Sequence, residues 1–168
     1  MKLFVDRLPS PIGTILLVWQ GHALRALEFA DNETRFERIM RRRYGASSLE
    51  PARVPAAIRD PIESYFKGDL TAIDRVPVDA NGTPFQKEVW KALREIPAGS
   101  TMSYGELAAR IGRQRASRAV GLANGSNPVG IVVPCHRVIG SKGALTGYGG
   151  GVDRKRWLLD HERGLSTF

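Results

Sequence analysis

The chain has 168 residues, 42% of them hydrophobic and 25% charged, which is an ordinary composition for a globular protein. No apolar run approaches the roughly 20 residues that span a bilayer, and the first residues lack the apolar core of a secretory signal. We therefore expect a cytoplasmic protein without membrane contact. The only cysteine, Cys135, excludes an intramolecular disulfide and a multi-cysteine zinc site.

The net charge of +8 is unevenly distributed along the chain. Residues 1–80 contain 12 Lys and Arg against 11 Asp and Glu, whereas residues 81–168 contain 13 against 6 and carry +7. A basic half of this size is expected of a protein that binds a polyanion, although a solubilising surface has the same composition.

The first half of the chain predicts a small α+β domain. Short apolar and β-branched runs separated by turn residues predict three strands in an antiparallel meander: Lys2–Leu8, Thr14–Trp19 and Leu24–Phe29. Helical patterns follow over Asn32–Tyr44 and Pro55–Phe66, with Gly68 as the expected end of the second helix. We expect one more strand at Ile73–Val78.

Two features of this half concern its surface and its end. The run Arg41-Arg42-Arg43 in the first expected helix can contact phosphate, but a solvated helix face is the interpretation we favour. The segment Pro77–Pro84 carries turn residues and little apolar periodicity. We therefore place the boundary between an N-terminal domain, residues 1–80, and a C-terminal domain, residues 81–168, in this segment.

Helical signals dominate the second half. Thr83 suits the N-cap of a first helix, and Pro84 suits its first turn. Ser103 is the expected N-cap of a second helix, and Glu106 three residues later completes a capping box. After a short glycine-containing turn, a third helix is expected over Ala116–Ala123, which is the pattern of a helix-turn-helix.

These elements together predict an α+β fold class. A small N-terminal domain, an antiparallel sheet with helices, is followed by a mainly helical C-terminal domain with a helix-turn-helix of winged-helix type. The third helix is unusual because its side chains are small except for Arg118. Small residues allow close approach either to another helix or to a narrow DNA groove. The lack of several long polar side chains argues against a sequence-specific reader of the major groove.

Cys135 is followed directly by His136. A free cysteine is often a small buried hydrophobic residue, and nothing in this dipeptide excludes that role. An imidazole beside a thiol is also a common way to lower the thiol pKa and create a nucleophile. The residues alone leave both interpretations open.

The surrounding motifs resemble one known family. Pro134-Cys135-His136-Arg137-Val138 resembles the active-site signature of the O6-alkylguanine-DNA alkyltransferases, also called methylated-DNA–protein-cysteine methyltransferases. Further resemblances follow the family's order within residues 83–163: Tyr104, Arg118–Gly121, Asn127-Pro128, Thr146–Gly151 and Trp157–Glu162. Residues 1–80 resemble the family's variable N-terminal domain only loosely.

The resemblance implies DNA repair by a single irreversible transfer. Cys135 would take the alkyl group from O6 of guanine in double-stranded DNA, with O4-alkylthymine as a secondary substrate class. No cofactor is implied. Some members hold zinc in the N-terminal domain through cysteines and histidines. Here that domain has no cysteine and a single histidine, His22, so a zinc site of this type is excluded. We expect a monomer, and cooperative binding along DNA stays open.

The resemblance also implies roles for the catalytic residues. His136 would take the proton of the Cys135 thiol through a water, and Glu162 would orient the imidazole, which is the logic of a hydrolytic triad. Asn127 would hold the active-site segment. Tyr104 would donate a hydrogen bond toward N3 of the leaving guanine.

DNA contacts and substrate recognition follow in the same way. The target base must leave the stack, so the third helix would enter the minor groove with Arg118 in the vacated space. Expected DNA contacts come from Ser103, Tyr104, Arg118, Ala119 and Gly121. Expected pocket residues are Pro134, Val138, Tyr148 and Gly149. Some relatives have serine in place of Gly149, so an O6 contact here would come from the backbone N–H, and the pocket would be roomier.

Two rival functions are weighed against this one. A non-catalytic DNA-binding sensor is disfavoured by the presence of Cys135 itself. A cysteine hydrolase is disfavoured by the ordered DNA-facing motifs and by the lack of a separate oxyanion-loop signal.

Overall fold

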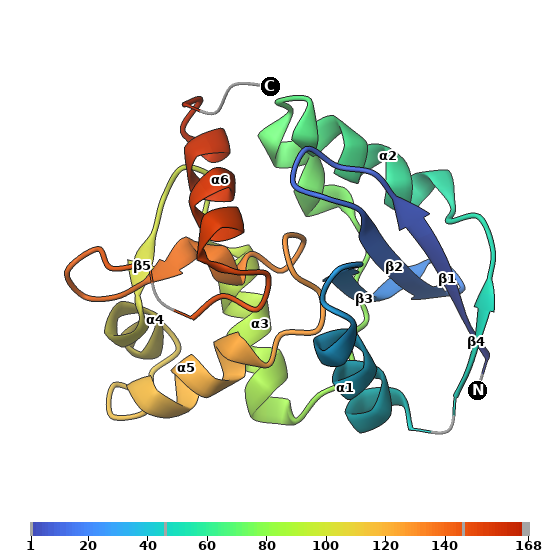
Figure 1. Ribbon diagram of the computed structural model, residues 1–168. Helices are drawn as coiled ribbons and strands as arrows, with labels where there is room; N and C mark the ends of the chain where they lie inside the picture. Colours follow the sequence, from blue (N-terminus) through green and yellow to red (C-terminus); the bar gives the residue numbers. More distant parts are fainter. Residues whose placement is uncertain (1, 46, 146, 166–168) are drawn as a thin grey trace. The chain divides into compact units, whose positions relative to one another are not determined.

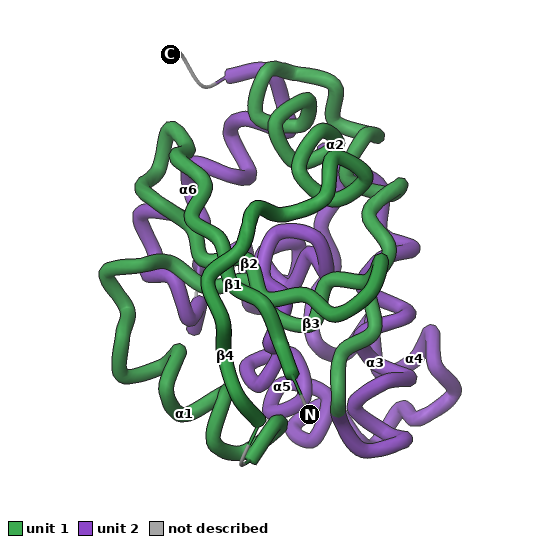
Figure 2. The backbone as a smooth tube through the Cα atoms, turned by 90° about the vertical axis from the view of Figure 1, so that its right-hand side faces the viewer, with its two compact units in different colours: residues 1–81 green, residues 82–168 purple. Residues whose placement is uncertain are grey.

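The computed structural model describes residues 2–45, 47–145 and 147–165. The chain divides into two compact units, residues 1–81 and 82–168 (Figure 2). Thr146, the first residue of the expected pocket loop, lies outside the described residues. Within the described part of the chain, every helix is too short or too polar to span a membrane.

The first unit contains a four-stranded sheet in the order β3-β2-β1-β4 (Figure 1). Strands β1 (Lys2–Leu8), β2 (Ile15–Gln20) and β3 (Ala23–Phe29) form the predicted antiparallel meander. Strand β4 (Ser48–Pro51) pairs in parallel with β1 and was not predicted. All four of its residues are exposed, so the strand lacks the alternation of buried and exposed residues that identifies a strand in sequence.

Helix α1 (Glu33–Tyr44) packs its apolar stripe on the sheet. Ile39 and Tyr44 join a buried cluster with strand residues, and Phe36 and Met40 pack against that cluster. Of the arginine run, Arg41 and Arg42 are exposed, while Arg43 donates a hydrogen bond to the Asn81 carbonyl at 2.9 Å. Helix α2 (Ala56–Phe66) ends at the capping residue Lys67, with Gly68 following at φ +112°.

The strand predicted at Ile73–Val78 is wrong. Residues Leu70–Arg75 form the 3₁₀-helix η1, which packs against α2 and buries the neighbouring residues Ala72 and Ile73. Pro77 has no N–H to donate to a sheet ladder, so only a single bridge remains, between Val78 and Leu24. Apolar content without period-two alternation misled the strand prediction.

The second unit is mainly helical, and the α+β class is confirmed. It contains α3 (Pro84–Arg94), α4 (Tyr104–Arg110), α5 (Ser117–Gly125), α6 (Val152–Glu162), the 3₁₀-helix η2 (Cys135–Arg137), and a short parallel pair of strands, β5 (Met102–Ser103) with β6 (Val138–Ile139). Helix α5 packs against α3 and α4, and the predicted helix-turn-helix is α4 and α5 with their connecting turn.

The helix starts follow the predicted capping chemistry. The Thr83 hydroxyl accepts from the Gln86 N–H, and the Gln86 side chain accepts from the Thr83 N–H, which is a complete capping box. The Ser103 hydroxyl accepts from the Glu106 N–H at 3.0 Å, one of the two hydrogen bonds of the expected box. These caps fix where α3 and α4 begin.

Helix α5 buries one side and exposes the other. Val120, Ala123 and Asn124 are buried, and the Trp90 indole on α3 donates to the Ala123 carbonyl at 2.9 Å. This hydrogen bond anchors α5 on α3. The exposed side contains Arg118 and, in part, the small residues that distinguish this helix.

Candidate active site

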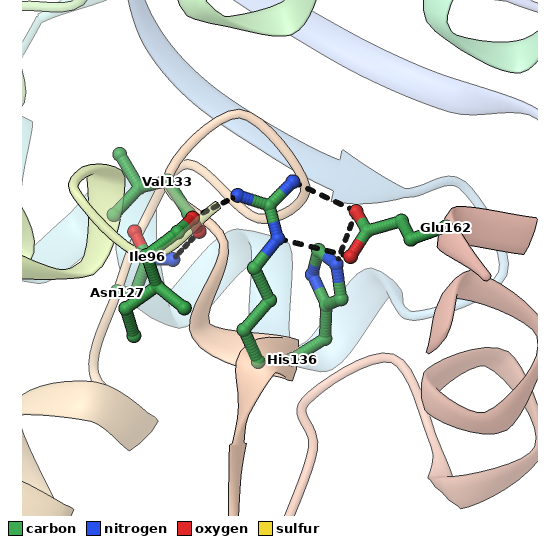
Figure 3. Close-up of polar contacts among 6 residues, drawn as sticks. Ile96, Asn127, Val133, His136 and Glu162 are labelled. Carbon is green, nitrogen blue, oxygen red and sulfur yellow. Dashed lines mark hydrogen bonds and ion pairs between the residues drawn. The ribbon is translucent and has the colours of Figure 1, made fainter. Parts of the chain in front are cut away.

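The segment between α5 and β6 places Cys135. Asn127 fastens this segment, because its amide N–H donates to the Val133 carbonyl at 2.8 Å (Figure 3). Its amide oxygen accepts from the Val129 N–H at 2.9 Å. Between these two anchors, Ile131 adopts φ +71°, a left-handed conformation that is unfavourable for a β-branched residue. A rare backbone conformation persists only where its surroundings enforce it, so the Cys135 segment is held in one shape.

Cys135 lies in η2 with 8% of its surface exposed. Its backbone N–H donates to the Val133 carbonyl at 2.8 Å, and its carbonyl accepts from the side-chain amide of Asn124 at 3.4 Å. The sulfur is therefore carried by a backbone that α5 and the Asn127 segment position together. A nucleophile with little exposure reacts only with a group that can reach it past the residues that cover it.

His136, Arg137 and Glu162 form a buried network. The His136 Nε2 lies 2.9 Å from Glu162 Oε2 (Figure 3). Arg137 donates to both Glu162 oxygens, from Nε at 2.9 Å and from Nη2 at 2.8 Å, and its Nη1 donates to the Ile96 carbonyl at 2.6 Å. The structure thus brings together His136 and Glu162, which are 26 residues apart in sequence.

Electrostatics fix the charge states of this network. Burial raises the pKa of the Glu162 carboxyl, but the opposing contacts with His136 and Arg137 outweigh burial and hold that pKa well below its usual range. Burial lowers the pKa of His136, the charges of Arg137 and Lys155 lower it further, and together they outweigh the raising effect of Glu162. Near neutral pH the network therefore contains a carboxylate, a guanidinium and a neutral imidazole.

These charge states determine the histidine tautomer. An ionised carboxylate only accepts hydrogen bonds, so Nε2 of His136 must carry the ring proton. The other ring nitrogen, Nδ1, then has a lone pair, and it is buried without a hydrogen-bond partner among the described residues. This lone pair can accept a proton, as the neutral imidazole of a general base must.

The remaining expected pocket residues surround this centre to different degrees. Tyr148 is half-buried, and its ring stands edge-on to the His136 ring with 6.5 Å between centroids. Pro134 and Val138 are buried, whereas Gly149 is exposed. The structure thus brings Tyr148 to the network.

The expected DNA-contacting residues lie on α4, on α5 and just before α4. Arg118 and Ala119 are exposed on α5, and Ser103 and Tyr104 are half-buried. Gly121 is different, because a Cβ added there would lie 3.6 Å from the Tyr104 ring. Gly121 therefore faces the Tyr104 ring across an ordinary van der Waals distance.

Comparisons with known proteins agree on one family. A family model described as the 6-O-methylguanine DNA methyltransferase DNA-binding domain matches residues 84–164. The chain is 47% identical over 165 residues to the methylated-DNA–protein-cysteine methyltransferase of Salmonella typhimurium, covering 96% of each chain. It is 48% identical over 157 residues to that of Mycobacterium bovis, covering 92% of this chain and 88% of the other.

A solved structure extends the match to the whole fold. The crystal structure of Mycobacterium tuberculosis O6-methylguanine methyltransferase has a TM-score of 0.82 at 43% identity, covering 98% of this chain and 95% of the other. The crystal structure of Mycobacterium tuberculosis OGT in complex with DNA gives the same TM-score of 0.82 and 43% identity, covering 99% and 95%. The chain belongs to the methylated-DNA–protein-cysteine methyltransferase family.

Three buried residues of this methyltransferase-family site were not singled out from sequence. Arg137 binds Glu162, Asn124 contacts the Cys135 carbonyl, and the Lys155 ammonium donates to the Val138 carbonyl at 2.6 Å. Burial lowers the pKa of Lys155, and the charge of Cys135 acts in the opposite direction. Arg137 lies inside the family signature, and Lys155 lies one helical turn before Leu158 and Leu159. The sequence therefore shows where these two residues stand, but it does not show that their side chains are buried.

Proposed function

We propose that this chain repairs DNA by transferring an alkyl group from O6 of guanine, and secondarily from O4 of thymine, to Cys135. The observation that carries the proposal is the buried pair of His136 and Glu162 beside a cysteine that a strained segment holds in place. A neutral imidazole with an unpaired Nδ1 next in sequence to a thiol is suited to remove the thiol proton. Family membership supports the same reaction.

The chemical step follows from these charge states. Glu162 keeps the proton of His136 on Nε2, so Nδ1 accepts the Cys135 proton through a bridging water. The thiolate attacks the alkyl carbon, the new S–C bond forms as the C–O6 bond breaks, and the electron pair leaves with guanine. Tyr104 donates a hydrogen bond toward guanine N3, and the proton taken by His136 neutralises the departing base. The protein keeps the alkyl group, so each molecule reacts once.

The second unit would be the DNA-binding and acceptor domain, with the first unit as a separate N-terminal domain. A guanine stacked in a duplex cannot reach a cysteine that is 8% exposed, so the damaged base must flip out. Arg118 would occupy the vacated space, while Ala119 permits close approach to the groove. Ser103 and Tyr104 would contact phosphates. Such contacts are independent of sequence, as repair requires.

Substrate recognition would use the walls around the sulfur. Pro134 and Val138 line the buried side and present backbone groups to the base, and Tyr148 closes the pocket near His136. At Gly149 a contact to O6 would come from the backbone N–H. An exposed glycine at this position leaves room for alkyl groups larger than methyl.

Intact-protein mass spectrometry tests the proposal directly. The protein is mixed with a duplex containing O6-methylguanine, and we expect a mass increase of one methylene group, mapped by peptide digestion to Cys135. The variant Cys135→Ser should bind the duplex and keep its mass. An unchanged mass of the parent protein under conditions where it binds the duplex would refute alkyl transfer and favour a damage sensor.

A further inference from the structure

Leu122 on α5 is an apolar side chain outside the network of His136, Arg137 and Glu162. It is 72% exposed, the highest value among the exposed large hydrophobic residues in the described part of the chain. A single exposed leucine is ordinary on a protein surface and needs no explanation by itself. Its position on the helix is what distinguishes it.

Leu122 follows Arg118 by one helical turn. Residues four apart lie on the same side of an α-helix, with about 5–6 Å between their Cβ atoms. The other exposed residues near this line are small: Ala119 and Gly125, where an added Cβ would meet nothing within 4 Å. The exposed side of α5 is therefore a smooth surface from which two long side chains project, one cationic and one apolar.

We propose that Leu122 packs against the deoxyribose rings that line the minor groove of the bound duplex. This inference rests on the proposed function, in which Arg118 takes the place of the flipped base. Leu122 lies within residues 84–164, which match the family's DNA-binding domain, and it is exposed on the same side of α5 as Arg118. Minor-groove proteins frequently insert leucine and other apolar side chains between base steps. Here Arg118 takes the place in the stack, and the apolar surface left for Leu122 is the carbon face of deoxyribose on the groove wall.

This contact has a distinct thermodynamic signature. An apolar side chain displaces no counterions from DNA, so Leu122 contributes affinity that is independent of salt. It also reads no base, so its contribution is the same for damaged and undamaged duplexes. Because Leu122 is not among the residues placed around Cys135, it has no part in the reaction with a free alkylated base.

The test compares Leu122→Ala with Leu165→Ala, a matched leucine that is 67% exposed outside α5. Binding to an undamaged duplex is measured at several salt concentrations, and alkyl transfer is measured with a damaged duplex and with a free O6-alkylated guanine. We expect Leu122→Ala to weaken duplex binding about tenfold, as burial of one leucine allows. For Leu122→Ala, the slope of log affinity against log salt and the rate with the free base should match those of the parent protein. For Leu165→Ala, the duplex affinity, the slope and the rate should all match those of the parent protein.

Parent-like duplex affinity of Leu122→Ala would overturn the proposal. So would a loss of self-association with unchanged duplex affinity, which would assign Leu122 to a contact between protein copies. Because duplex binding is read on undamaged DNA, the result is independent of alkyl transfer. Failure of Cys135 to gain mass in the parent protein would instead refute the proposed function.

Discussion

One short segment of the chain connects α5 to Cys135 in η2. The exposed side of α5 and the reactive centre around Cys135 nevertheless differ in which kinds of residue are buried and which are exposed. Around Cys135, the ionisable residues His136, Arg137 and Glu162 are buried, and the first two both bond to Glu162. On α5, the exposed residues are small except for Arg118 and Leu122. Chemistry requires fixed charges in a region of low dielectric, whereas DNA contact requires a surface that comes close without reading sequence.

This difference predicts two kinds of variant. Changes in the buried network should alter stability and reactivity toward every substrate, because the groups there depend on one another. Changes on the exposed side of α5 should leave stability within about 0.5 kcal/mol and affect only reactions that require duplex DNA.

The largest effect on stability should come from Arg137→Met. This change removes the guanidinium that donates to both oxygens of buried Glu162, and breaking a buried ion pair costs about 3–5 kcal/mol. Urea unfolding followed by circular dichroism measures the loss. The control is Arg163→Met, since Arg163 is exposed just after α6. Equal stability of the two variants would show that Glu162 does not depend on Arg137.

Stability should also depend on pH through His136. Its folded-state pKa is lowered chiefly by burial, so below about pH 6.5 the unfolded state binds a proton that the folded state does not. The contribution of His136 to the free energy of unfolding should therefore be at its maximum above about pH 7, and it should decrease as the pH is lowered toward 5. The depressed pKa of Glu162 adds a second loss below about pH 4.5, where the unfolded carboxyl becomes protonated.

Unfolding curves of His136→Gln measured between pH 7.5 and 5 isolate the first of these two effects. The fall over this range should shrink in His136→Gln, whatever its absolute stability. His22, which is exposed in the turn between β2 and β3, supplies the control His22→Gln. An unchanged slope in His136→Gln would contradict a neutral buried imidazole.

The smallest effect concerns Ser103, which has both a structural and a DNA-facing role in this account. Ser103→Ala removes the cap of α4 and should cost about 1 kcal/mol. Ser103→Asp keeps the cap and should retain stability, yet its charge should weaken duplex binding by repelling phosphate. Thermal unfolding and duplex titration of both variants separate the roles. Parent-like binding by Ser103→Asp would remove Ser103 from the DNA surface.

Local signals were enough to predict much of the fold. The Thr83 and Ser103 caps and the three-stranded meander depend on residues close in sequence, and the structure contains them. Strand β4 was missed because its pairing with β1 depends on a partner about 46 residues away and leaves no alternation in its own sequence. The false strand at Ile73–Val78 arose because apolar residues alone do not distinguish a strand from a short helix.

The candidate site shows the same limit. The resemblance to the methyltransferase family is confirmed, and it rested on residue types in order along the chain. The supporting residues Arg137, Asn124 and Lys155 escaped because their importance lies in burial and in partners 11 to 25 residues away. Charged side chains are mostly exposed, so the sequence alone predicts that Arg137 and Lys155 lie on the surface.

One crossed measurement tests the separation of the two regions most directly. Single-turnover alkyl transfer is measured for Arg118→Ala and Glu162→Gln, each with a damaged duplex and with a free O6-alkylated guanine. Arg118→Ala should slow transfer from the duplex by about tenfold or more and leave the free base unchanged, whereas Glu162→Gln should slow both substrates by about a hundredfold, the usual scale for lost acid–base assistance. Equal losses of Arg118→Ala on both substrates, or a parent-like rate of Glu162→Gln with the free base, would contradict the account.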